Sequence, residues 1–90
     1  MKNSNGSTST AKSASEAVRR ALARREFRES PEMVRALRRR AGLALVDVAD
    51  ALGVEQSSVC RWERGDRVPR GEAAVAYLEL LRAATEGDAP

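Results

Sequence analysis

The stretch from Leu45 to Gly65, LVDVADALGVEQSSVCRWERG, constrains the fold of this chain more than any other stretch. Its first half has apolar residues at i, i+3, i+4 and i+7, the pattern of one helix face. These residues are Leu45, Val48, Ala49 and Leu52. Gly53 follows where helices commonly end in the left-handed conformation that glycine adopts most easily. Val54 restarts the apolar pattern, and Val59 and Trp62 continue it. The stretch therefore predicts two short helices joined by a tight turn, with the small Ala49 where they cross.

The second predicted helix has a polar outward face. Its outward residues are Gln56, Ser57, Cys60, Arg61 and Arg64. Glutamine and arginine side chains can form paired hydrogen bonds with the edges of adenine and guanine. Cys60 is less informative, because a lone cysteine is more often a small hydrophobic residue than a reactive centre. This face is the candidate site for reading nucleic acid.

Residues at fixed offsets in this stretch resemble the helix-turn-helix pattern of the phage-repressor and Cro-like (XRE-type) transcriptional regulators. The matching residues are Ala49, Gly53, Val54, Val59, Trp62, Glu63 and Gly65. The following segment, RWERGDRVPRGEAAVAYLELL, also looks like the corresponding part of DNA-binding antitoxins. The resemblance covers roughly residues 32–84. It implies an all-α, lambda-repressor-like domain whose second motif helix lies in the major groove of double-stranded DNA.

The resemblance also assigns roles to individual residues. The implied base contacts are Gln56, Ser57 and Arg61, and the implied phosphate contacts are Ser58, Arg64, Arg67 and Arg70. Phosphate contacts position such a domain without specifying a base sequence. Arg38 and Glu63 occupy the positions of an ion pair that ties the first family helix to the recognition helix. Trp62 occupies a core position.

Three features depart from the family pattern. Leu45 stands where the first motif helix usually has a polar residue, and Glu55 stands at the usual Ser or Thr N-cap of the recognition helix. Asp47 and Asp50 make the first motif helix acidic, which would repel the DNA backbone. The docking is then tilted towards the Arg-rich N-terminal side, or the affinity for DNA is modest.

The chain divides into four segments. Residues 1–12 lack large apolar side chains and predict a disordered arm. Residues 13–29 predict an Arg-rich helix that begins with a capping box, Ser13 to Glu16. This helix could dock on the domain through Val18 and Leu22, pair with a partner chain, or lie along DNA. Residues 30–85 form the DNA-binding domain, and residues 86–90 a frayed end.

The sequence predicts two further helices, one before and one after the helix-turn-helix, which gives about five helices in total. Ser30, Pro31 and Glu32 are typical of a helix start, and Gly42 ends that helix. Its predicted buried stripe is Met33, Val34, Leu37 and Ala41. The last helix spans roughly 71–85, with Ala74, Val75, Leu78 and Leu81 inward.

Charge is clustered along the chain. Residues 16–41 carry nine Arg against four acids, and residues 61–70 carry four Arg against two, whereas residues 43–56 carry three acids and no base. Arginine binds phosphate and guanine well through its planar fork, although codon usage could equally explain its excess over lysine. The basic clusters favour a polyanionic partner.

Composition excludes several other classes of function. The chain has no His and a single Cys, which rules out intrachain disulfides, His-containing metal sites and imidazole-based triads. No signal peptide or membrane-length apolar run is visible, so we expect a cytoplasmic protein without cofactor, metal or enzymatic activity. We expect a sequence-specific DNA-binding repressor. An antitoxin or other protein-interaction module that binds a toxin or regulator is the alternative. The sequence leaves the operator, dimerisation and any longer parent chain open.

Overall fold

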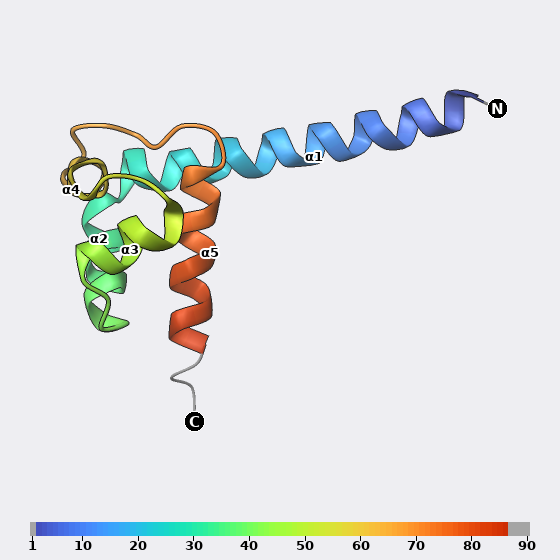
Figure 1. The fold of residues 1–90 in the computed structure, drawn as a ribbon. Coiled ribbons are helices and arrows are strands. Elements are labelled where there is room, and N and C mark those ends of the chain that lie inside the picture. The colour runs from blue at the N-terminus through green and yellow to red at the C-terminus, as the bar shows by residue number, and fades with distance from the viewer. Residues whose placement is uncertain (1, 87–90) are drawn as a thin grey trace.

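The protein is described by a computed structural model that covers residues 2–86, with side chains from residue 13 onward. Within these residues there are five helices and no strand: α1 (Lys2–Glu29), α2 (Pro31–Arg40), α3 (Leu45–Leu52), α4 (Gln56–Arg64) and α5 (Ala73–Glu86). The predicted all-α fold with a central pair of short helices is confirmed. Figure 1 shows α2 to α5 gathered at one end of α1, which projects away from them. Of the predicted frayed end, residues 86–90, Glu86 is the last residue of α5, and residues 87–90 lie outside the described residues.

Helix α1 is longer than the sequence predicted. It runs through the expected capping box at Ser13–Glu16 without interruption, so a helix start at that point is wrong. Residues 2–12, predicted as a flexible arm, continue the helical backbone of α1 in the structure. Their behaviour in solution stays a prediction, which is taken up in the Discussion.

The three aromatic side chains of the protein form the centre of the core. Phe27 of α1 lies edge-on to Trp62 of α4, with ring centroids 6.4 Å apart, and 5.5 Å from the ring of Tyr77 of α5. Such edge-on and tilted pairs stabilise a core beyond their buried area. Phe27 and Ala23 are buried, and they anchor α1 to the domain. Docking through Val18 and Leu22, one of the three alternatives for this helix, is wrong, because these side chains are 56% and 57% exposed.

Helix α2 begins at Pro31, as predicted, but Ser30 forms no side-chain cap hydrogen bond. Proline suits the first helical position because its missing N–H has no helical partner there. Val34 is buried and Leu37 packs against the core. Met33 is 57% exposed, so its place in the predicted buried stripe is wrong.

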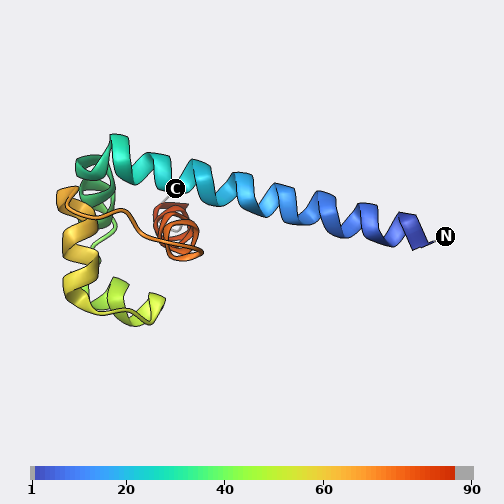
Figure 2. The ribbon, with the colours of Figure 1, turned by 90° about the horizontal axis from the view of Figure 1, so that it is seen from above.

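The α3–turn–α4 unit has the predicted geometry. Gly53 ends α3 with φ +69°, and the N–H groups of Gly53 and Val54 donate to the carbonyls of Asp50 and Ala49. This pair of hydrogen bonds is a Schellman motif, which turns the chain sharply and requires the left-handed conformation. Ala49 is buried between the helices. The turn sets the angle at which α4 leaves α3 (Figure 2).

Helix α5 closes the domain and begins at Ala73, two residues after the predicted start. Ala74, Val75 and Leu81 are buried as predicted, and Leu78 packs partly against the core. The sequence interpretation omitted Tyr77, which is fully buried on the same face. Across residues 2–86, the helices are too short or too polar for any of them to traverse a lipid bilayer.

Candidate nucleic-acid interface

Helix α4 presents a polar face to solvent. Gln56, Ser57, Arg61 and Arg64 are exposed, and Ser58 is half-buried. Ser57, Arg61 and Arg64 are spaced i, i+4 and i+7, so they form one stripe along the helix. Gln56 lies beside this stripe in the first turn. The structure thus brings the four residues together on one accessible surface, and their contacts with DNA stay a prediction.

The opposite face of α4 is held in the core. Val59 is fully buried and Trp62 is 5% exposed, so the interpretation of Trp62 as a packing residue agrees with its position. Glu63 is also buried on this face, at 6% exposure. A carboxylate at such a site needs hydrogen-bond partners, because burying an unpaired charge costs on the order of several kcal/mol.

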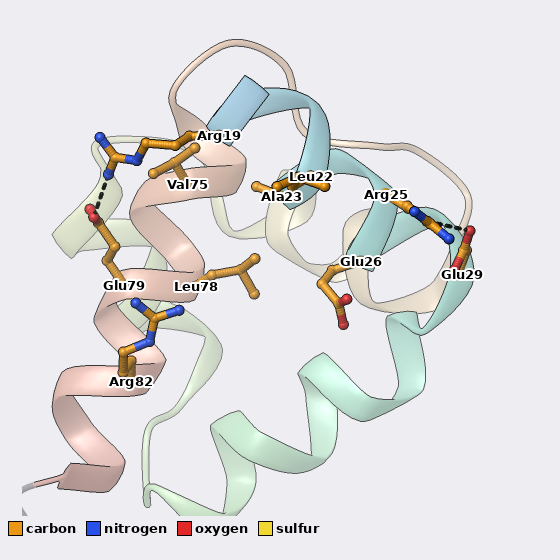
Figure 3. Close-up of a pocket in the computed structure, with 10 residues that line it drawn as sticks. All are labelled: Arg19, Leu22, Ala23, Arg25, Glu26, Glu29, Val75, Leu78, Glu79 and Arg82. Carbon is orange, nitrogen blue, oxygen red and sulfur yellow. Dashed lines mark hydrogen bonds and ion pairs between the residues drawn. The ribbon is translucent and has the colours of Figure 1, made fainter. Parts of the chain in front are cut away.

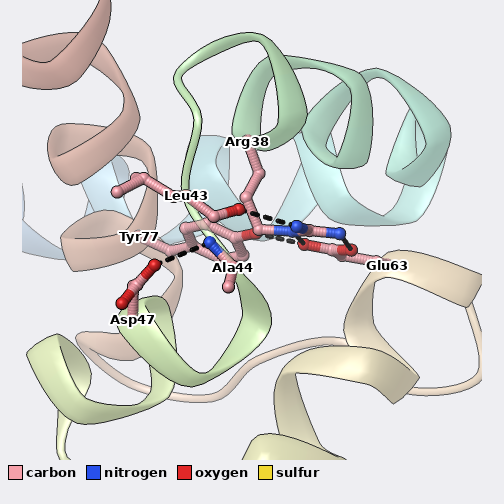
Figure 4. Close-up of polar contacts among 6 residues, drawn as sticks. All are labelled: Arg38, Leu43, Ala44, Asp47, Glu63 and Tyr77. Atoms are coloured by element: carbon pink, nitrogen blue, oxygen red, sulfur yellow. Dashed lines mark hydrogen bonds and ion pairs between the residues drawn. The ribbon is translucent and has the colours of Figure 1, made fainter.

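One guanidinium, that of Arg38, and one phenol, that of Tyr77, supply these partners (Figure 4). The guanidinium of Arg38 makes a two-pronged pair with Glu63, with Nε 2.6 Å from Oε2 and Nη2 3.0 Å from Oε1. Its Nη1 donates to the carbonyl of Leu43 at 2.8 Å. The hydroxyl of Tyr77 donates to Oε2 of Glu63. The pair predicted between Arg38 and Glu63 is therefore present, and it links α2, α4 and α5.

The pKa values of the donors are shifted by this arrangement. The hydrogen bond to Glu63 raises the pKa of Arg38, against the lowering effect of burial. Burial, followed by the hydrogen bond to Glu63, raises the pKa of the Tyr77 phenol well above its ordinary value. Both groups therefore keep their protons throughout the physiological range and remain donors.

The hydrogen-bond network of Arg38, Glu63 and Tyr77 holds the buried face of α4, which lies opposite its polar face. Arg38 reaches Glu63 from α2, Tyr77 reaches it from α5, and Leu43 ties the same guanidinium to the segment that enters α3. No buried side-chain polar atom among the described residues lacks a partner. A fully satisfied network of this kind favours one orientation of the helix.

The loop after α4 carries the predicted phosphate-contacting arginines. Arg67 and Arg70 are exposed on either side of Pro69, which is fully buried and anchors the loop. Arg64 is exposed at the end of α4, and its guanidinium lies 2.9 Å from Asp66. The loop crosses from the end of α4 to the start of α5 (Figure 1). Arg64 would have to leave Asp66, or share it, to contact phosphate.

Helix α3 differs from the family pattern in a way that the structure partly explains. Asp47 accepts a hydrogen bond from the N–H of Ala44 at 2.8 Å, so this acid caps the start of α3. Leu45 packs against the core instead of facing a polar partner. Asp50 is exposed and has no such capping role. One of the two acids in α3 is therefore structural.

The start of α4 is open. Glu55 occupies the N-cap with an extended backbone and forms no side-chain cap hydrogen bond. The N–H groups of Ser58 and Val59 donate to the carbonyl of Glu55, and no side chain caps the first turn, which lies at the positive end of the helix dipole. Cys60 is a free, half-buried cysteine on the same helix.

Tyr77 is the residue at this site that the sequence interpretation missed. It lies between Ala74 and Leu81 at helical spacing, and a buried tyrosine hydroxyl usually finds a hydrogen-bond partner. That combination is a usable signal, although it does not identify Glu63 as the partner.

Comparison with known proteins agrees with this geometry. No significant match was found among curated proteins or among solved structures. A family model described as a helix-turn-helix domain matches residues 32–89, well over half of the 90-residue chain. The match extends from the first turn of α2 through α5 and leaves α1 outside it. The chain therefore belongs to the helix-turn-helix domain family of DNA-binding regulators.

Proposed function

We propose that the protein is a sequence-specific regulator of transcription, a repressor of the phage-immunity or Cro-like kind, that places α4 in the major groove of its operator. The observation that carries the proposal is the contrast between the two faces of α4. Its inner face is fixed by the network around Glu63, whereas its outer face presents Gln56, Ser57 and Arg61 to solvent. A rigid helix with free hydrogen-bonding groups is suited to direct readout of base edges.

In this proposal the basic residues around α4 hold the domain on the backbone. Ser58, Arg64, Arg67 and Arg70 contact phosphates, and the open first turn of α4 offers N–H groups to another phosphate. Arg38 and Glu63 do not touch DNA. They orient the recognition helix.

Several arginines of α1 have other partners. Arg19 lies 2.8 Å from Glu79, Arg20 lies 2.9 Å from Glu72, and Arg25 lies 2.9 Å from Glu29. These exposed pairs are individually weak, but they reduce the positive charge that α1 offers to DNA. The backbone contacts are therefore assigned to the α4–α5 loop rather than to α1.

The proposal is tested by the affinity of the full chain for DNA upstream of its own gene and for a scrambled duplex of the same length. Fluorescence anisotropy at several salt concentrations gives both quantities. We expect tighter binding to the upstream duplex and a steep linear fall of log K with log salt, because each neutralised phosphate releases counterions. Equal affinity for both duplexes would contradict sequence-specific binding.

A second candidate function is recognition of a partner protein, such as a toxin or another regulator. The surface of α3 favours it, because Val46 is 47% exposed beside the acidic Asp50. An acidic surface with an exposed apolar side chain suits a basic protein better than it suits DNA. Absence of salt-dependent binding to any duplex would favour this function over the first.

A further inference from the structure

The loop between α4 and α5 lies along the last turns of α1 and is held there at both ends (Figures 1 and 2). At its start, a Cβ added to Gly65 would lie 3.3 Å from Cγ of Pro31, the first residue of α2. At its end, a carboxylate oxygen of Glu72 lies 2.9 Å from Nη1 of Arg20 of α1. The loop therefore runs beside α1 in the opposite direction.

Two further arginines of α1 lie on the side of the helix that faces this loop. Arg24 and Arg28 follow Arg20 at i+4 and i+8, so the three side chains form one row along the helix. The groove between α1 and α5 is lined by other residues of α1, which are Arg19, Leu22, Ala23, Arg25, Glu26 and Glu29 (Figure 3). Since Arg20 reaches the end of the loop, the row continues along the loop towards its start.

Arg24 and Arg28 differ from the paired arginines of α1. Neither forms an ion pair with another residue in the part of the chain whose side chains are described. Arg28 is exposed, and Arg24 is half-buried. A guanidinium stays charged at every physiological pH, so both residues offer positive charge to a partner outside the chain.

The loop contributes a second pair of such charges. Arg67 and Arg70 are exposed on either side of the buried Pro69, and neither forms an ion pair with a described residue. The two acids of the loop, Asp66 and Glu72, are already paired with arginines outside it. Two arginines from α1 and two from the loop thus form one basic strip.

We propose that this basic strip, which consists of Arg24, Arg28, Arg67 and Arg70, binds the sugar-phosphate backbone of DNA beside the base pairs that α4 reads. The strip begins next to the end of α4 and leads away from it along α1, so its far end meets phosphates outside the groove in which α4 lies. Arginines on a helix and on an anchored loop suit phosphate oxygens, which they bind through two parallel hydrogen bonds.

Helix α1 lies outside the residues that the helix-turn-helix family model matches. The contribution of Arg24 and Arg28 is therefore a property of this chain that the domain alone would lack. It rests on the proposed DNA binding by α4 and extends the bound backbone beyond the contacts of the loop.

The first test measures the affinity of the full chain for the duplex upstream of its own gene and for a scrambled duplex, by fluorescence anisotropy over a range of salt concentrations. The double variant Arg24→Ala, Arg28→Ala should reduce the slope of log K against log salt by about two on both duplexes. The ratio of the two affinities should stay unchanged, because phosphate contacts do not specify a base sequence. The double variant Arg24→Lys, Arg28→Lys should keep most of the slope, because it keeps both charges.

Arg82 provides the matched control for a single charge. Like Arg28, it is exposed and forms no ion pair with a described residue, but it lies in the groove on the α5 side of α1 (Figure 3). Arg28→Ala should reduce the slope by about one, whereas Arg82→Ala should leave it unchanged. Circular dichroism confirms that each variant keeps its helix content.

The second test is hydroxyl-radical footprinting of the upstream duplex. The native protein should protect backbone positions at one edge of its site that the double alanine variant leaves open, while both protect the centre. Equal slopes for Arg28→Ala and Arg82→Ala, or identical footprints, would overturn the role of α1 and leave DNA binding by α4 intact. Equal native affinity for both duplexes, together with the loss of slope in the double alanine variant, would contradict operator readout and support the strip. A native protein that binds neither duplex would overturn both.

Discussion

The hydroxyl of Tyr77 donates a hydrogen bond to Oε2 of Glu63, the same oxygen that accepts from Nε of Arg38. One carboxylate thus joins three helices: α2 through Arg38, α4 through its own backbone, and α5 through Tyr77. The orientation of α4 and the stability of the core depend on the same buried group. Substitutions around Glu63 should therefore change both.

Removing Glu63 should destabilise the domain strongly. The side chains of Arg38 and Glu63 are only 10% and 4% exposed, so Glu63→Ala leaves a buried guanidinium without its partner. We expect a loss of about 3–5 kcal/mol in the free energy of unfolding. Glu86→Ala, at the exposed end of α5, is the control and should change stability little. Urea denaturation measures both, and equal midpoints would contradict the role of the pair.

Removing the phenol hydroxyl should have a smaller effect. Tyr77→Phe keeps the ring against Phe27 and Trp62 and keeps the two-pronged contact of Arg38 with Glu63. It removes one hydrogen bond to a charged acceptor, for which we expect a loss of about 1.5–3 kcal/mol. A variant as stable as the native protein would show that the hydroxyl adds nothing to the network.

Tyr77 should also make stability depend on pH in alkali. Its pKa is raised in the folded protein, so above about pH 10 the unfolded chain loses a proton that the folded chain retains. The stabilisation is fully present below that pH and declines above it, by up to about 1.4 kcal/mol per pH unit. Tyr77 is the single tyrosine of the chain, so phenolate absorbance reports its ionisation alone. Tyr77→Phe should show a flatter decline between about pH 10 and 12, and identical slopes would refute this origin.

Phe27 should hold α1 on the domain. Its side chain is 1% exposed and contacts both other aromatic rings. Phe27→Ala should lower the free energy of unfolding by about 3–5 kcal/mol, because it removes a large buried side chain and leaves a cavity. Met33→Ala, at an exposed position, provides the comparison and should cost little. A similar thermal midpoint for the two variants would place α1 outside the cooperative core.

Residues 2–12 are predicted to be flexible in solution. Their sequence contains no large apolar side chain that could offset the entropy lost on ordering. Their amide protons should exchange about as fast as those of an unfolded peptide, whereas those of α4 should be protected. Protection along residues 2–12 equal to that in α4 would refute the prediction.

The sequence predicts the central motif well because its signals are local. Gly53 and Gly65 adopt the left-handed conformation that ends each motif helix, and the apolar spacing of α3 and α4 matches their buried faces. A Cβ at Gly65 would also lie 3.3 Å from Cγ of Pro31, a close approach that no local pattern reveals. These signals need only one or two helical turns of sequence.

The docking of α1 and the partner of Tyr77 could not be predicted in the same way. In α1, Val18, Leu22, Ala23 and Phe27 lie on more than one side of the helix, so periodicity alone did not select the face that packs. Phe27 lies on the face that packs, because the aromatic rings of Trp62 and Tyr77, from distant segments, contact it. Likewise, 14 residues separate Tyr77 from Glu63, and their hydrogen bond depends on how α5 packs against α1, α2 and α3.

The last prediction separates base readout from backbone binding. Arg61 is exposed on the outer stripe of α4, so Arg61→Ala should weaken binding to the operator by about 1–3 kcal/mol and relax preference at one or two base pairs. Arg67 lies on the loop held by Pro69, so Arg67→Ala should weaken specific and random DNA alike. It should also reduce the slope of log K against log salt by about one. Arg19 of α1, which is paired with Glu79 of α5, is the control, and its replacement by alanine should change neither quantity. If Arg61→Ala affects both duplexes equally while Arg67→Ala alters base preference, α4 is not the helix that reads the bases.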